Sequence, residues 1–306
     1  MDHFENHEKR NEMKATGNTF NMGKIKLWTV SALLIGAVLL FWCFRDMMPN
    51  AGTNEVSYTI GDRWELPSEL REISAIAWLD TDRIAAVQDE QGTIFIYDLG
   101  KREVAKKIEF GGPGDYEGLA IYQKDAYVLE SNGRISEIKD FQSAGRTVNF
   151  YETSFNSDNN MESLGLDAGQ DRLLMVPKDR DLASDRSKGI YPFDLDIKKL
   201  DSVPAFQIDM GDDVLKRFRK NDISKIFRPS DLAIRPGTKE IYVLEGASPK
   251  LLILDADGNA KKAYPLDKKS FPQPEGITFG PDGTLYISSE GKKGAGGTIT
   301  ELKLRR

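Results

Sequence analysis

Five copies of one strand-rich unit constrain the fold of this chain more than any other feature. The copies begin at Ser74, Glu117, Glu162, Ser230 and Glu275, and their starts are separated by 43, 45, 68 and 45 residues. Each copy has a strand of small apolar residues, a turn, a second strand, another turn and a third strand. A repeat of this length with several short strands per unit is typical of the blades of a β-propeller.

The two ends of the repeat region predict how the ring closes. The last copy stops after three strands, at the sequence GTITELKL. The segment 55–66, EVSYTIGDRWEL, belongs to no copy, and it can supply the missing outer strand of the last blade. We therefore expect an all-β fold, a five-bladed β-propeller over residues 55–306.

The third copy leaves one alternative open, because it is about 23 residues longer than its neighbours. A degenerate sixth blade within it would make the propeller six-bladed. We expect instead an insertion at about 180–227, since the apolar residues at 214, 215, 218, 223 and 226 have the spacing of a helix. This helical segment, 210–227, would pass over one face of the propeller.

An apolar run near the N-terminus predicts a membrane anchor. Residues 27–44 contain no charged side chain, and 18 residues of helix span about 27 Å, close to the thickness of the bilayer core. Trp28 and Trp42 lie near its ends, as interfacial anchors do. A cleaved signal peptide is the alternative, but the sequence after Arg45 offers only Pro49 and Ala51 at the spacing of a cleavage site. We expect an uncleaved transmembrane signal anchor followed by a linker at 45–54.

The charges beside this run predict its orientation. Five basic residues precede it and only Arg45 follows it closely; the five are Lys9, Arg10, Lys14, Lys24 and Lys26. Cytoplasmic flanks of membrane spans are enriched in Lys and Arg. We therefore expect a cytoplasmic tail at 1–26, a single pass through the plasma (inner) membrane, and a propeller that is periplasmic or extracellular.

Composition excludes several classes of function. The chain's net charge is −6, and residues 1–50 carry six basic against five acidic residues, which leaves −7 on residues 51–306. Nucleic-acid binding needs a basic face, so we expect none. The only cysteine is Cys43, and both histidines, His3 and His7, precede the apolar run. The propeller can therefore have no Ser-His-Asp triad and no histidine or cysteine ligand for zinc or haem, and a metal would be Ca²⁺ or, less readily, Mg²⁺.

Aligning the copies brings charged residues into two registers. The first lies just before the apolar core of the first strand: Ser74, Glu117, Glu162, Ser230 and Glu275. The second follows the second strand: Asp89, Glu130, Lys178, Glu245 and Glu290. Since these strands are antiparallel and the first lines the channel, both registers should meet on one face. Seven of the ten residues are acidic, which predicts an acidic central face, although solvated strand ends alone can also be acidic.

The strand sequences resemble a known family. EISAIAW, DYEGLAI, NMESLGLD, RPSDLAI and especially PQPEGITFGPDGTLYISSE are similar to the SdiA-regulated domain family, YjiK-like bacterial propellers related to NHL-repeat propellers. The resemblance covers most of 66–304 and implies a propeller behind a membrane-anchoring segment, an envelope location and calcium binding. The family's Glu-Gly motif matches Glu117, Glu162 and Glu275. The sequence departs from it at Ser74, with Glu72 nearby, and at Ser230, beside Asp231.

These observations favour a binding or scaffold module over an enzyme. We expect Glu117, Glu162 and Glu275 to contact Ca²⁺ or a cationic or metal-bridged ligand. The outer set is Asp89, Glu130, Lys178, Glu245 and Glu290, in which Lys178 would pair with an acid or with an anionic group of the ligand. A Ca²⁺- or Mg²⁺-dependent hydrolase of the lactonase or phytase type is the alternative, and a protein–protein platform is a third. The glycine-rich stretch 291–297 lacks the ending of a phosphate loop, so we expect no nucleotide.

Overall fold

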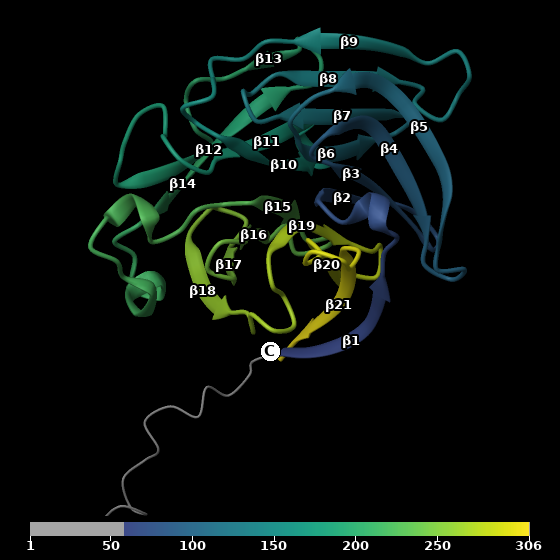
Figure 1. The fold of residues 1–306 in the computed structure, drawn as a ribbon. Helices are drawn as coiled ribbons and strands as arrows, with labels where there is room; N and C mark the ends of the chain where they lie inside the picture. Colours follow the sequence, from purple (N-terminus) through teal and green to yellow (C-terminus); the bar gives the residue numbers. More distant parts are fainter. Residues whose placement is uncertain (1–57, 306) are drawn as a thin grey trace, which may run out of the picture. The chain divides into compact units, whose positions relative to one another are not determined.

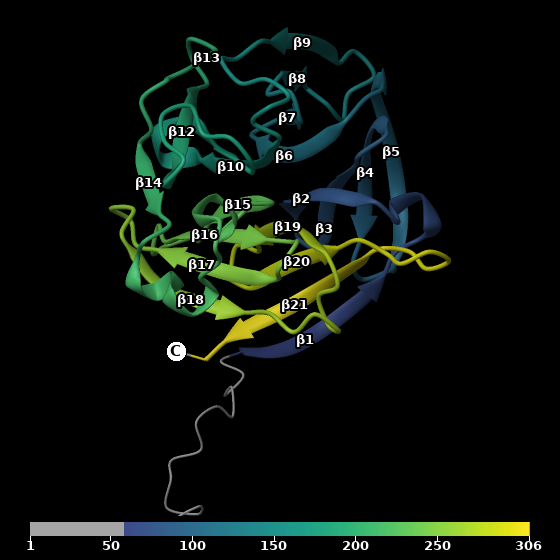
Figure 2. The ribbon, with the colours of Figure 1, turned by 60° about the vertical axis from the view of Figure 1, so that its left-hand side comes forward.

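The computed structural model describes residues 58–305, which form five antiparallel sheets around a central axis (Figures 1 and 2). The first blade contains β2 (Ile73–Asp80), β3 (Arg83–Gln88), β4 (Gln91–Asp98) and β5 (Glu103–Pro113). The second contains β6 (Tyr116–Tyr122), β7 (Asp125–Glu130), β8 (Ile135–Lys139) and β9 (Thr147–Tyr151). The third contains β10 (Met161–Asp167), β11 (Arg172–Pro177), β12 (Ser187–Asp194), β13 (Lys199–Leu200) and β14 (Phe206–Asp209). The predicted five-bladed propeller is confirmed, and no sixth blade forms among these residues.

The last two blades close the ring. The fourth contains β15 (Asp231–Ile234), β16 (Ile241–Glu245), β17 (Lys250–Leu254) and β18 (Ala260–Pro265). The fifth contains β19 (Pro274–Phe279), β20 (Leu285–Ser289), β21 (Thr298–Leu304) and, as its outer strand, β1 (Tyr58–Glu65). The register joins Tyr58 to Leu304 and Glu65 to Thr298. The segment before the first copy therefore completes the last blade, as its sequence predicts.

The core is divided among the five contacts between blades. Each first strand contacts the next around the ring, in the order β2, β6, β10, β15, β19 and back to β2. Five clusters of buried apolar side chains fill the spaces between adjacent blades. Between the fourth and fifth blades, for example, Tyr242 and Phe279 meet edge to face with ring centroids 4.9 Å apart. The alternation of side chains along each strand thus buries both faces of every blade.

The long third unit contains short helices as well as strands. The range predicted as an insertion, about 180–227, includes β12, β13 and β14, so only its later part is additional to the blade. That part forms two 3₁₀ helices, η3 (Asp213–Phe218) and η4 (Ile223–Lys225); two more, η1 (Ser68–Leu70) and η2 (Ala168–Gln170), lie elsewhere. Leu215 and Ile226 are buried between the third and fourth blades, which explains the apolar spacing of this segment.

Within residues 58–305, no helix combines the length and apolarity needed to cross a membrane. The predicted tail at 1–26, anchor at 27–44 and linker at 45–54 lie outside the described residues.

Asp231 connects three blades at the axis. Its carboxylate accepts hydrogen bonds from the amides of Leu232 at 2.8 Å, Ile277 at 2.8 Å and Leu164 at 3.4 Å. These amides belong to the first strands of the fourth, fifth and third blades. Burial raises the pKa of Asp231 well above its ordinary value, and the three amides oppose that effect. The first strands have no further strand on the axial side to accept hydrogen bonds from these amides. The Asp231 carboxylate supplies the acceptor instead.

We expect Asp231→Ala to lower the free energy of unfolding by about 3 kcal/mol, because it leaves buried amides without an acceptor. Urea denaturation of the full chain measures the change. The matched control is Asp257→Ala, which removes an exposed carboxylate from a turn of the same blade. Equal stability of the two variants would contradict the role of Asp231.

Candidate functional site

β-bulges position the inner register of acidic residues. In β6 the pairing with β7 passes from Tyr116 to Gly118, so Glu117 is left out of the ladder. The same shift of one residue leaves out Glu162 in β10 and Glu275 in β19. A bulge turns an extra side chain away from the alternation of the strand. The three glutamates therefore lie at the start of three first strands, where they reach toward the axis.

Lys178 joins these residues from the end of β11. Its ammonium group is ion-paired with Glu162 Oε1, while Glu162 Oε2 is buried without a hydrogen-bond partner among the described residues. Glu275 lies against Gly246, where an added Cβ would come within 2.8 Å of Glu275 Oε1. We call Glu117, Glu162, Glu275 and Lys178 the acidic hub.

Burial and mutual repulsion favour protonation of the hub carboxylates. Burial is the main cause that raises the pKa of Glu117 to about 9, and the charges of Glu162, Asp115 and Glu275 add to it. Burial, followed by the charge of Glu162, raises the pKa of Glu275 to about 8, although Lys178 opposes this. At neutral pH these two groups therefore hold protons unless a cation replaces them.

Lys178 is the cation of the hub. Burial disfavours its charged form, but Glu162, Glu275 and Glu117 outweigh burial and raise its pKa. It therefore remains an ammonium group and compensates one carboxylate. Burial raises the pKa of Glu162, and Lys178 is the strongest influence against that rise.

Two acidic residues of the outer register are engaged in local ion pairs. Glu130 accepts two hydrogen bonds from Arg134, at 2.8 and 2.9 Å, across the turn between β7 and β8. Glu245 is ion-paired with Lys250, its direct neighbour across β16 and β17, and both side chains are fully buried. Glu245 also accepts a hydrogen bond from the amide of Arg228 at 3.1 Å. These contacts tie both glutamates to neighbouring residues of their blades, although Glu245 Oε1 is buried without a hydrogen-bond partner among the described residues.

The other two outer acids, Asp89 and Glu290, form what we call the rim pair. Burial, followed by the charge of Asp89, raises the pKa of Glu290 to about 7, and a hydrogen bond of 2.7 Å from Gln273 opposes this rise. Burial and then the charge of Glu72 raise the pKa of Asp89, whose Oδ1 is buried without a hydrogen-bond partner among residues 58–305. The rim pair adds negative charge beside the hub.

The serines of the inner register have structural contacts. Ser230 Oγ donates to the carbonyl oxygen of Pro274 at 3.0 Å, which connects the fourth and fifth blades. Ser74 Oγ donates to the carbonyl oxygen of Glu72 at 3.3 Å. The Glu72 carboxylate itself is ion-paired with Arg71 at 2.7 Å. The inner ring of carboxylates is therefore incomplete at the first and fourth blades.

The structure thus brings Glu117, Glu162, Glu275 and Lys178 together, places Asp89 and Glu290 nearby, and directs Glu130 and Glu245 to hairpin partners. Within the described part of the chain, no three His, Cys, Asp or Glu side chains are grouped closely enough to form a ready metal site. The ligand prediction for these residues stays a prediction.

The sequence assigns no role at this site to two residues that contribute to it, Asp115 and Asp231. Asp115 raises the pKa of both Glu117 and Asp89, and it precedes β6 directly. Asp231 occupies the position at which the other blades have Ala75, Gly118, Ser163 and Gly276. Aligning the copies shows a charged residue at a position that is otherwise small, and this exception could have identified Asp231 as a residue with a special role.

Comparison with known proteins identifies the family. A model of the SdiA-regulated family matches residues 53–292. The chain belongs to the SdiA-regulated family. No curated protein matches this member of the family.

Solved structures with a similar fold are distant in sequence. Myxococcus xanthus glutaminyl cyclase is 13% identical with a TM-score of 0.55, over 81% of this chain and 96% of that one. The PQQ-bound aldose sugar dehydrogenase of Streptomyces coelicolor is 12% identical with a TM-score of 0.49, over 81% and 98%. A streptogramin B lyase is 14% identical with a TM-score of 0.47, over 82% and 100%. At these identities the likeness to the glutaminyl cyclase shows the fold alone.

The raised pKa values predict how stability depends on pH. Glu117 and Glu275 keep protons up to about pH 9 and 8 in the folded protein but lose them near the ordinary pKa of 4.5 when it unfolds. The folded state binds more protons in this window, so its stability should fall as pH rises. We expect the Tm of the metal-free full chain to drop by at least about 5 °C between about pH 5.5 and pH 8.

Glu117→Gln combined with Glu275→Gln should reduce this drop, as measured by circular dichroism melts, and the raised pKa values of Asp231 and Glu290 should account for part of the remainder. Glu103→Gln combined with Glu109→Gln, on the exposed surface of β5, should retain it. The same pH slope in both double variants would show that the hub is not its source.

Proposed function

We propose that this propeller is a binding module whose acidic hub and rim pair take Ca²⁺ or a cationic group of a larger ligand. The observation that supports this is the gathering of three carboxylates from three blades around one lysine. Burial and mutual repulsion raise the pKa values of these carboxylates, and Lys178 offsets that effect only in part. The unpartnered oxygens of Glu162 and Asp89 offer acceptors for one.

The two kinds of cation make different demands on the site. Ca²⁺ takes six to eight oxygen ligands at about 2.3–2.6 Å, so the glutamates would have to move closer together. A protonated amine or a guanidinium group has several donors and can bridge carboxylates that stay apart. Glu117 and Glu275 would be the inner contacts in either case, and water would complete the shell of Ca²⁺.

A metal-dependent hydrolase of the lactonase or phytase type is the alternative. Hydrolysis by a metal-bound water needs a general base that is deprotonated near the working pH. Glu117 and Glu275 hold protons at neutral pH, which is the state of a general acid. We therefore favour binding, and a screen of lactone, ester and phosphate substrates with Ca²⁺ separates the two functions.

Calorimetric titration of the EDTA-treated full chain tests the binding proposal. We expect Ca²⁺, or the diamine putrescine as a probe for cationic groups, to bind and to raise the Tm. Glu117→Gln combined with Glu275→Gln should weaken the binding at least tenfold, about 1.4 kcal/mol. The matched control is Glu103→Gln combined with Glu109→Gln. If Ca²⁺, Mg²⁺ and putrescine all fail to bind, the binding proposal is wrong, and the remaining hypothesis is a platform for protein–protein interaction.

The affinity for the cation should also increase with pH. Glu290, Glu275 and Glu117 lose protons at about pH 7, 8 and 9, and a cation must displace those protons to bind. Each proton released makes affinity rise up to about tenfold per pH unit below the pKa concerned. Titrations at about pH 6, 7 and 8 measure this. If the affinity does not change between about pH 6 and pH 8, the cation binds at a site other than the hub.

A further inference from the structure

A cleft between the fourth and fifth blades lies at the other end of the strands from the acidic hub. It has a volume of about 520 Å³ and lies between β16–β18 and the pair β20–β21. β15 and β19 begin at the hub, and the cleft is lined by residues at and beyond their last residues, including Arg235 and Phe279. The two sites are therefore separated by the length of the first strands.

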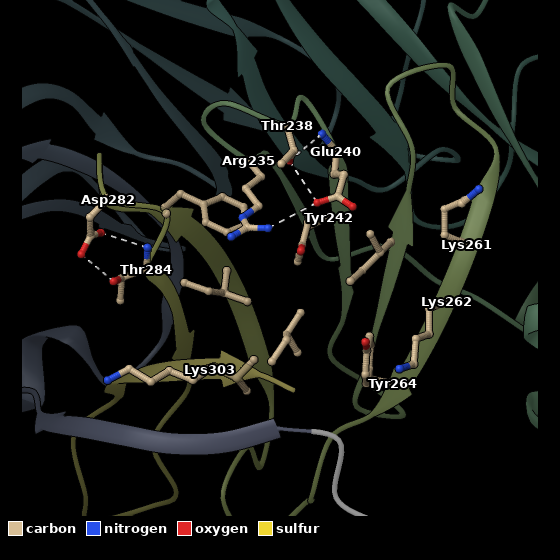
Figure 3. Close-up of a pocket in the computed structure, with 16 residues that line it drawn as sticks. Arg235, Thr238, Glu240, Tyr242, Lys261, Lys262, Tyr264, Asp282, Thr284 and Lys303 are labelled. Carbon is tan, nitrogen blue, oxygen red and sulfur yellow. Dashed lines mark hydrogen bonds and ion pairs between the residues drawn. The ribbon is translucent and has the colours of Figure 1, made fainter. Parts of the chain in front are cut away.

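The interior of this cleft is aromatic and aliphatic. Tyr242 and Tyr264 from the fourth blade face Phe279, Leu285 and Leu302 from the fifth, and these side chains are buried. Figure 3 shows the polar side chains arranged around this apolar interior. Such a combination of apolar walls with a few polar groups is typical of sites for small molecules.

Basic side chains outnumber acidic ones in the lining of the cleft, unlike in the propeller as a whole. Four basic side chains line it, Arg235, Lys261, Lys262 and Lys303, against two acidic ones, Glu240 and Asp282. Residues 51–306 as a whole carry a net charge of −7, since the chain has −6 and residues 1–50 have +1. Lys261 and Lys303 are paired with Asp255 and Glu301, so the positive charge available to an anion comes from Arg235 and Lys262.

Two of these basic groups have free capacity. Arg235 Nη1 lies 3.5 Å from Glu240 Oε2, longer than the roughly 2.7–2.9 Å of a strong charge-assisted pair. Thr238 Oγ1 donates to the same oxygen at 3.0 Å (Figure 3). Lys262 has no ion pair among the described residues, and its ammonium group lies 4.6 Å from the centre of the Tyr264 ring. By contrast, Lys261 and Lys303 are paired with Asp255 and Glu301.

We propose that this cleft binds a small carboxylate with an aromatic or aliphatic body. The planar guanidinium of Arg235 matches the geometry of a carboxylate, and Lys262 supplies a second positive charge. Tyr242, Tyr264 and Phe279 form the wall of the cleft against which the apolar body of the ligand would pack. A single negative charge suits the cleft better than a phosphate dianion, because Glu240 and Asp282 lie beside the basic groups.

Three probes with the same body and different heads test this inference: 3-phenylpropionate, 3-phenylpropylamine and 3-phenylpropanol. Calorimetric titration of the full chain should give saturable binding of the carboxylate with a Kd on the order of 1 mM. We expect the amine and the alcohol to bind at least tenfold more weakly. Equal binding of all three probes, or no saturable binding of the carboxylate, would overturn the proposal.

Variants locate the binding. Arg235→Gln combined with Lys262→Gln should weaken 3-phenylpropionate at least tenfold, and the control Lys101→Gln combined with Lys139→Gln, on exposed surfaces of the first two blades, should not change it. If the double variant does not fold, Lys262→Gln alone should fold, because that side chain is exposed and has no structural ion pair. This single variant should still weaken the binding of 3-phenylpropionate about threefold. Unchanged affinity in the Lys262 variant would overturn the proposed site. Neither result depends on whether the acidic hub binds a cation.

Discussion

Close packing of five first strands around one axis is the constraint on which the rest of this structure depends. Little room remains there for side chains, so the positions that face the neighbouring blades are small, as at Gly118 and Gly276. An added Cβ on Gly276 would lie 2.8 Å from the amide nitrogen of Ile76 in the next blade. Any charged group at this axis is therefore removed from water and must find a partner, a proton or a ligand.

The charged groups at the axis have either a partner or a proton. Asp231 has three backbone amides as partners, and Glu162 has Lys178. Glu117 and Glu275 have no such cation to themselves, and burial raises their pKa to about 9 and 8. The same packing that stabilises the ring thus produces carboxylates with raised pKa, which is a common property of functional sites.

Much of this arrangement could be predicted from the sequence, because blades repeat and turns separate them. The five blades, the closing strand and the convergence of Glu117, Glu162 and Glu275 follow from aligning the copies. The bulges could not be predicted, since they depend on the register between two strands rather than on the pattern within one. The pairing of Glu245 with Lys250 could not be predicted from the alignment of the copies, because it joins neighbours across a hairpin rather than equivalent positions of different blades.

Hairpin partners also determine where negative charge remains available. The second and fourth blades neutralise their outer glutamates with Arg134 and Lys250, and the third blade has Lys178 at the same position. The fifth and first blades have no such partner for Glu290 and Asp89 among the described residues. Their uncompensated charge is therefore concentrated on one side of the hub. On our proposal, an approaching cation would meet the rim pair first and would displace the protons of Glu290 and Glu275 as it binds.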